Sequence, residues 1–183
     1  LADHSPYLWA LVREDPERLA RLLGRPPEES LDALVFALGQ RRDEDEAELM
    51  RALRRAKRES ALLIALADIG GVWDVVQATE ALTRFADAAV RAAVAFLLRQ
   101  AARAQVLTLD PDAAAIEDGS GIVVLALGKH GARELNYSSD VDLIVRYDPA
   151  AASIPPGTAP APLFAKLTRG LVRLMADRTS YGY

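Results

Sequence analysis

The chain has 183 residues, of which 51% are hydrophobic and 26% are charged, so it can bury a core in one large or two small domains. Its net charge of −4 argues against a general nucleic-acid binder, which would usually carry a basic face. The lack of cysteine excludes disulfides and thiolate metal sites.

The start of the chain and its hydropathy predict a cytoplasmic protein. The sequence begins at Leu1 rather than Met, which indicates part of a longer protein, and it shows no secretory signal pattern. Its longest purely apolar run, Ala61–Ala67, is far too short to span a bilayer. We therefore expect neither a membrane nor a nucleic acid as a partner.

Residues 1–105 carry the pattern of a helical portion. Asp15 is a suitable N-cap for a helix over Glu17–Leu23, and Ser30 is predicted to begin the next helix, which ends before Gly39. A third helix begins in the acidic run after residue 43 and ends near residue 68, ahead of two glycines. Asp74 is expected to cap a long helix that runs to about residue 104.

Several side chains of this portion have a structural and a functional interpretation. The basic run at residues 51–58 is either a nucleic-acid or phosphate patch or, as we expect, a solvated helix face. Trp9 and Trp73 are predicted to be core residues rather than ligand platforms. Asp68 is predicted to be structural, with an approach to an active site as the alternative.

Residues 106–183 have a different texture and are predicted to form a second portion. Turn residues at 106–120 precede a short apolar strand, Ile122–Leu127, and a loop that can include a short helix. A second strand, Val141–Tyr147, is followed by an exposed proline-rich connection. An amphipathic helix over Pro162–Arg178 is expected to cover the sheet, which gives an α+β fold.

Asp140 and Asp142 are the strongest candidates for chemistry. Two carboxylates two residues apart, leading into a strand, are expected to point to the same face. At ~5 Å and an effective dielectric of ~20, they would repel each other by roughly 3 kcal/mol. A divalent cation between them would remove that cost, and Mg²⁺ suits such a pair because it takes oxygen ligands, water and substrate phosphates.

Three residues beside the aspartates are candidates for binding a nucleotide or phosphate. Gly128 lets the backbone approach a phosphate without a side chain in the way. Lys129 is either a phosphate contact or an exposed loop lysine, and Ser139 is either a phosphate ligand or a turn residue. Nearby, His130 is predicted to be a loop residue, and Arg133 is expected to form a local pair with Glu134, with substrate binding as the alternative.

The strand–Gly–loop–Asp-x-Asp–strand order resembles the DNA-polymerase-beta-like nucleotidyltransferases. Within them, the chain is similar to the glutamine synthetase adenylyltransferase/adenylyl-removing enzyme family over about residues 5–180. The matching signature comprises Gly128-Lys129, Gly131, Arg133–Leu135 and Asn136–Leu143, with upstream similarity at Leu49–Lys57 and Ala67–Gly71.

The resemblance implies an enzyme with two related catalytic halves that regulates nitrogen assimilation. One half transfers AMP from ATP to a tyrosine of glutamine synthetase, and the other removes it by phosphorolysis to give ADP. The helical segment before the motif and the form of the motif resemble the removing half. Asp140 and Asp142 would then be catalytic and would bind Mg²⁺, with Mn²⁺ able to substitute, and ATP, ADP, phosphate and the nitrogen-signalling PII protein would be partners.

Two further expectations follow from the resemblance. The family carries a third metal-binding carboxylate on a strand shortly after the region that matches Thr179–Tyr183, so the core at residues 106–183 is expected to be incomplete at its C-terminus and inactive alone. The alternatives are the adenylylating activity, or a nucleotidyltransferase fold without catalysis that serves as a regulatory or interaction module.

Overall fold

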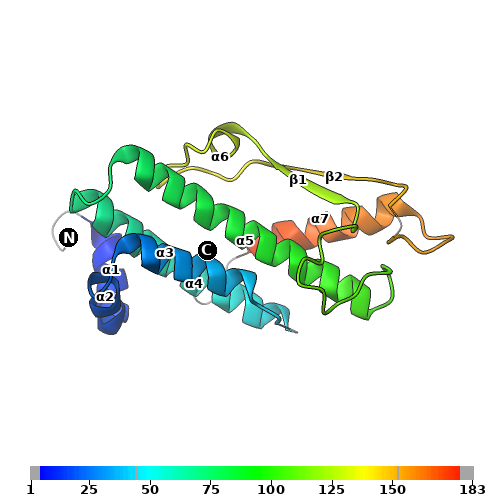
Figure 1. The fold of residues 1–183 in the computed structure, drawn as a ribbon, viewed down its shortest axis with the longest axis horizontal. Helices are drawn as coiled ribbons and strands as arrows, with labels where there is room; N and C mark the ends of the chain where they lie inside the picture. Colours follow the sequence, from blue (N-terminus) through cyan, green and yellow to red (C-terminus); the bar gives the residue numbers. More distant parts are fainter. Residues whose placement is uncertain (1–4, 44, 152, 178–183) are drawn as a thin grey trace.

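The computed structural model describes residues 5–43, 45–151 and 153–177, and it confirms the predicted α+β fold. The N-terminal part is helical and the C-terminal part contains a two-stranded sheet (Figure 1). The elements are, in chain order, α1 (Pro6–Glu14), α2 (Pro16–Leu23), α3 (Pro27–Gly39), α4 (Glu46–Ile69), α5 (Val75–Arg103), β1 (Ile122–Ala126), α6 (Gly128–Gly131), β2 (Leu143–Tyr147) and α7 (Pro160–Ala176).

Side-chain caps fix the starts of several helices. The Asp15 carboxylate accepts a hydrogen bond from the Arg18 backbone N–H at 3.0 Å, as its predicted capping role requires. Asp74 and Gln77 form a reciprocal capping box at the start of α5, with N···O distances of 2.8 and 2.9 Å. By contrast, α3 begins at Pro27 instead of Ser30, because proline fits the first turn, where no backbone N–H is needed.

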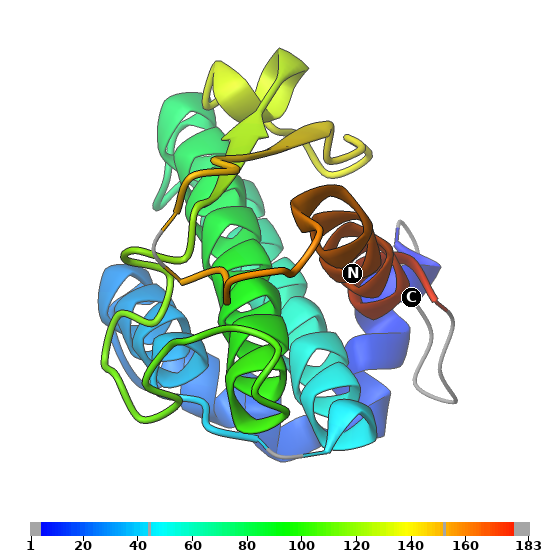
Figure 2. The same ribbon diagram turned by 90° about the vertical axis from the view of Figure 1, so that its right-hand side faces the viewer.

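Helix α5 is the central element of the molecule. Helices α3, α4 and α7 pack around it, with α7 also contacting α4, and the β1–β2 hairpin lies along α5 on the side away from α3 and α4 (Figures 1 and 2). Because it is covered from several directions, α5 buries small residues such as Ala89 and Ala93 around much of its surface. Gly170 of α7 permits close packing here, since a Cβ at this position would lie 2.7 Å from Leu97 of α5.

The hairpin is attached to this core by its inner face. Strands β1 and β2 are antiparallel and pair from Ile122 with Tyr147 to Ala126 with Leu143. Ile122 and Val124 face the core, whereas Val123 on the other face is 49% exposed. The ring of Tyr147 stacks on Phe164 of α7 with centroids 4.6 Å apart, so α7 covers the sheet as predicted.

The described residues form two core clusters. The first joins the second half of α5 to α7 and to the inner face of the hairpin, so it takes residues from both sides of the predicted boundary at residues 105 and 106. The second lies among α1, α2, the start of α3, α4 and the start of α5. Trp73 belongs to it and is 5% exposed, but the prediction for Trp9 was wrong, because that side chain is 40% exposed on α1.

The basic run at residues 51–58 is not a uniformly solvated face. Arg54 is buried, and its guanidinium donates to the backbone carbonyls of Leu174, Met175 and Asp177 at 3.2, 3.3 and 2.7 Å. These carbonyls lie at the C-terminal end of α7, where a helix lacks internal donors. Arg54 therefore joins α4 to α7 across more than a hundred residues of sequence.

None of the helices in the described ranges combines the length and the apolar character that crossing a bilayer requires. Arg178, where the predicted last helix ends, and the region Thr179–Tyr183 lie outside the described residues.

Candidate active site

The end of the β1–β2 hairpin brings Asp142 beside Gly128. The Leu127 N–H donates to the Asp142 carbonyl at 2.9 Å, which continues the strand pairing by one residue. Gly128 has a φ of +53°, in the left-handed region that favours glycine. A Cβ built on Gly128 would lie 3.2 Å from the Asp142 Oδ2, so the missing side chain gives this carboxylate access to the backbone.

Asp140 and Asp142 are both exposed and precede β2, so the second strand starts later than predicted. Neither carboxylate has a hydrogen-bond or ion-pair partner among the residues that the structure describes. Unpaired carboxylates close in sequence retain their full capacity to accept a ligand cation. Their oxygen chemistry fits a Mg²⁺ ion that draws its other ligands from water and phosphate.

The described residues do not supply the third acidic ligand. Within residues 5–43, 45–151 and 153–177, no group of three or more His, Cys, Asp or Glu side chains is arranged to hold a metal ion. The predicted third carboxylate was placed after Tyr183 and lies outside these ranges. A two-carboxylate donor set is therefore what this part of the chain offers.

Lys129 and Ser139 lie on either side of the loop between the strands. Lys129 is exposed on α6, which is a single helical turn. This turn packs closely on the end of β1, and a Cβ on Gly131 would lie only 2.5 Å from the Ala126 carbonyl oxygen. The Ser139 hydroxyl accepts from the Asn136 N–H at 3.0 Å and donates to the Asn136 Oδ1 at 2.8 Å. Ser139 thus stabilises a turn before Asp140, while its binding of phosphate stays a prediction.

His130 is buried, which the sequence analysis did not predict. It lies in α6 with 3% exposure, and its Nε2 is 2.8 Å from the Asp87 Oδ1 of α5. It packs on α5 because α6 folds back from the end of β1 onto the long helix. The ring secures the glycine turn against the helical part of the molecule.

Arg133 pairs with α5 instead of its neighbour Glu134, so the predicted local pair was wrong. Its Nε donates to the Glu80 Oε2 at 2.8 Å, a second guanidinium nitrogen also binds Glu80, and Nη1 lies 3.8 Å from the Asp87 Oδ2. The backbone of Arg133 is left-handed, with a φ of +63°, which turns the chain after α6. The hydrogen bond from Arg133 lowers the pKa of the Glu80 carboxyl below its ordinary value.

Tyr137 connects the same loop to α4. Its hydroxyl donates to the Asp68 Oδ2 at 2.9 Å, close to the C-terminal end of α4. Burial raises the pKa of Tyr137, and the neighbouring Asp68 carboxylate raises it further because it stabilises the protonated hydroxyl. Asp68 therefore has a structural contact, as predicted, and the residue it holds lies in the loop that precedes the aspartates.

The acidic residues of α5 that hold the loop were missed from the sequence. Glu80 and Asp87 are seven residues apart, so they lie on one face of the helix, two turns from each other. Two acidic residues on one face of an otherwise alanine-rich and leucine-rich helix indicate that a positively charged group of another segment packs on that face. The spacing alone could not identify His130 and Arg133 as those partners.

A hairpin that presents two aspartates beside a glycine turn, supported by helices, is consistent with the nucleotidyltransferase class. The family model of the glutamate-ammonia ligase adenylyltransferases matches residues 1–183. The chain therefore belongs to the glutamate-ammonia ligase adenylyltransferase family.

Relatives at about half identity are bifunctional glutamine synthetase adenylyltransferase/adenylyl-removing enzymes. The chain is 52% identical to those of Bradyrhizobium diazoefficiens and Xanthobacter autotrophicus, and 48% identical to that of Rhodopseudomonas palustris strain CGA009. Each match covers 100% of this chain but only 18–19% of the relative. The chain thus spans about a fifth of the length of these relatives.

Proposed function

We propose that this chain contributes a catalytic site to a nucleotidyltransferase that acts on glutamine synthetase in the cytoplasm. We assign the site to the removal of AMP from an adenylylated tyrosine by phosphorolysis, a reaction that regulates nitrogen assimilation. The names of the relatives support glutamine synthetase as the substrate. The resemblance of the Asn136–Asp142 motif to the removing half supports the direction of the reaction.

The observation that carries the proposal is the arrangement of Gly128, Asp140 and Asp142 at the end of the hairpin. The two free carboxylates would hold Mg²⁺ or Mn²⁺, which when bound neutralises charge on the phosphate oxygens. A side chain on Gly128 would fill the space beside the Asp142 carboxylate, because its Cβ would lie only 3.2 Å from Oδ2. The glycine therefore leaves the backbone here open to the phosphate. We propose Lys129 and Ser139 as contacts to the nucleotide or phosphate.

In the proposed reaction, an oxygen of inorganic phosphate forms a bond to the adenylyl phosphorus. The bond from phosphorus to the tyrosine oxygen breaks, and the tyrosine leaves with the electron pair and takes up a proton. The products are ADP and unmodified tyrosine. The chain's own contribution is positional, because α5 and α4 fix the loop through Arg133, His130 and Tyr137.

Regulation by a nitrogen-signalling PII protein is part of the same proposal and rests on the resemblance alone.

The test measures both activities of the full-length protein, wild type and the double variant Asp140→Asn with Asp142→Asn. We expect release of ADP from adenylylated glutamine synthetase and phosphate to fall by at least about a hundredfold, as for loss of a charge-stabilising group. Transfer of AMP from ATP to glutamine synthetase should be retained. Asp118→Asn is a matched control, because Asp118 is an exposed aspartate without a side-chain partner in the described chain.

The reverse result would assign the site to the other half of the enzyme. If transfer is lost and removal is retained, the site belongs to the adenylylating half. If both activities match those of the control, the chain is a binding module and the catalytic proposal is wrong.

A further inference from the structure

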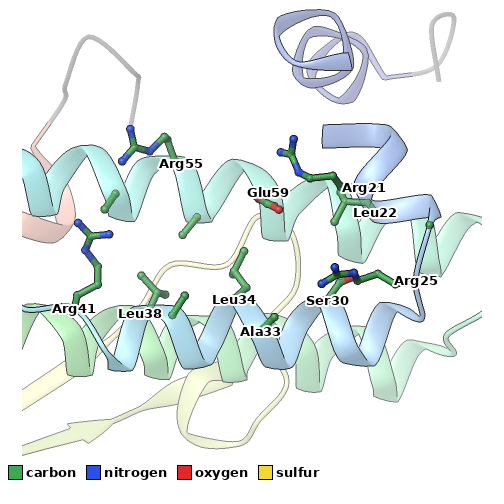
Figure 3. A pocket seen from close by; sticks show the side chains of 14 residues that line it. Arg21, Leu22, Arg25, Ser30, Ala33, Leu34, Leu38, Arg41, Arg55 and Glu59 are labelled. Carbon is green, nitrogen blue, oxygen red and sulfur yellow. The ribbon is translucent and has the colours of Figure 1, made fainter. Parts of the chain in front are cut away.

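A groove with a volume of about 550 Å³ lies between α2, α3 and α4, on the other side of α5 from the hairpin (Figures 1 and 3). Its floor consists largely of alanine and leucine side chains of α3 and α4. Its polar lining comprises Arg21, Arg25, Arg41, Arg55, Glu59 and Ser30. This volume falls within the range of pockets that bind small molecules.

The groove is rich in positive charge although the chain as a whole is acidic. Arg41 and Arg55 lie at one end, and Arg21 and Arg25 lie at the other (Figure 3). Glu59 is the one acidic residue among the lining residues. Asp15 and Asp43, just outside the lining, pair with two of the four arginines, so the excess of positive charge that attracts anions comes from the other two.

Two of the arginines are not neutralised by a neighbouring carboxylate. Arg21 contacts Asp15 at 3.3 Å, and the Nε of Arg41 donates to Asp43 at 2.6 Å. Arg25 and Arg55 have no ion-pair partner within the described part of the chain. Their guanidinium groups are exposed donors that can bind a phosphate through two parallel hydrogen bonds.

Ser30 supplies an independent sign of a missing ligand. It is 8% exposed, yet its Oγ has no hydrogen-bond partner among the described residues. A buried hydroxyl without a partner destabilises the folded state, so such groups are rare without a reason. The residue lines the groove at the same end as Arg25 in Figure 3.

We propose that this groove is a binding site for a nucleoside phosphate, separate from the aspartate site at the hairpin. Arg25, at the Ser30 end, would bind the phosphate groups, the alanine-rich and leucine-rich floor would take the apolar faces of the base and sugar, and Arg55 would contact the other end of the ligand. Ser30 would donate its hydroxyl hydrogen to the ligand. The planar guanidinium of Arg25 can bind two phosphate oxygens at once, which favours a phosphate at this end.

The test is calorimetric titration of ADP into the full-length protein carrying Asp140→Asn and Asp142→Asn, in EDTA to suppress metal-dependent binding. Arg25→Gln with Arg55→Gln should weaken one set of sites at least about tenfold, which corresponds to 1.4 kcal/mol. Arg91→Gln with Arg169→Gln is the matched control, since both are exposed arginines outside the groove. The control should bind ADP like its parent.

Ser30→Ala provides a second test that separates a ligand contact from a structural role. We expect weaker ADP binding with an unchanged or raised melting temperature, because the variant removes an unpaired hydroxyl. Three results would overturn the proposal. The parent protein does not bind ADP saturably, the control variant loses as much affinity as Arg25→Gln with Arg55→Gln, or ADP binding is unchanged both in Ser30→Ala and in that arginine variant. Saturable binding of succinate without binding of ADP or inorganic phosphate would overturn the assigned ligand class.

Discussion

Gly128 is the residue whose backbone conformation is most closely tied to the aspartates. Its φ of +53° disfavours any side chain, and a Cβ would lie 3.2 Å from the Asp142 Oδ2. Gly128→Ala should therefore lower the free energy of unfolding by about 1–2 kcal/mol and displace the carboxylate. Chemical denaturation and the removal assay on the full-length protein would measure the two effects.

Gly119→Ala is the control for backbone strain alone. Gly119 has a φ of +73°, but a Cβ there would meet no atom within 4 Å. We expect it to lower stability by a similar amount and to leave activity unchanged. An equal loss of activity in both variants would show that the contact between residue 128 and Asp142 does not affect catalysis.

Glu80 gives the loop attachment a defined pH dependence. Its pKa is lowered from the ordinary 4.5 because Arg133 donates hydrogen bonds to the ionised form. A lowered pKa in the folded state means that this stabilisation is present above pH 4.5 and is lost as the pH falls through the lower value. Glu80→Gln should thus be less stable than wild type at neutral pH, by about 0.5 kcal/mol as for exposed ion pairs.

The difference between wild type and Glu80→Gln should shrink as the pH falls below 4.5 and the wild-type carboxyl takes up its proton. Denaturation curves over a series of pH values from neutral to acid would measure it. Glu134→Gln serves as the control, because Glu134 is exposed beside Arg133 and has no ion-pair partner in the described chain. A difference that is constant with pH would contradict the role of the ion pair.

At the scale of elements, α5 connects the core to the candidate site. Its buried face packs against α3, α4 and α7, while Glu80 and Asp87 bind the loop between the strands. A two-stranded hairpin is only marginally stable by itself. The position of the aspartates therefore depends on the helices that hold both the hairpin and its loop.

The junction of α4 and α7 depends in the same way on Arg54. Replacing it with methionine would leave the carbonyls of Leu174, Met175 and Asp177 without this donor. We expect Arg54→Met to lower the free energy of unfolding by about 2–3 kcal/mol, since hydrogen bonds from a charged donor are lost. Arg51→Met, one turn earlier on the same helix, should change it by less than about 0.5 kcal/mol. Equal effects of the two variants in thermal unfolding would contradict this role.

At the scale of the whole molecule, the features that could be predicted from the sequence are those set by residues close together in the chain. The caps at Asp15 and Asp74 and the breaks at the glycines are local signals, and they predicted the helices to within a few residues. The signature at residues 128–143 likewise identified the hairpin end. The α+β fold followed from the helical periodicity and the two short apolar runs.

Long-range partners were not readable in this way. Arg54 looked like a surface residue because its partners lie about 120 residues later in the chain. His130 was assigned to a loop and Arg133 to a local pair because their partners are on α5, more than 40 residues earlier. Trp9 was expected in the core from its type alone, and nothing in a single helix shows which face the neighbouring helices cover.

The most direct measurement is a crystal structure of the full-length protein with ADP and Mn²⁺, whose anomalous scattering locates the ion. We expect an ion bound by carboxylate oxygens of both Asp140 and Asp142, at about 2.1 Å as for Mg²⁺, with the ADP phosphates beside Gly128. An ion elsewhere, or the two side chains turned away from each other and from the nucleotide, would contradict it.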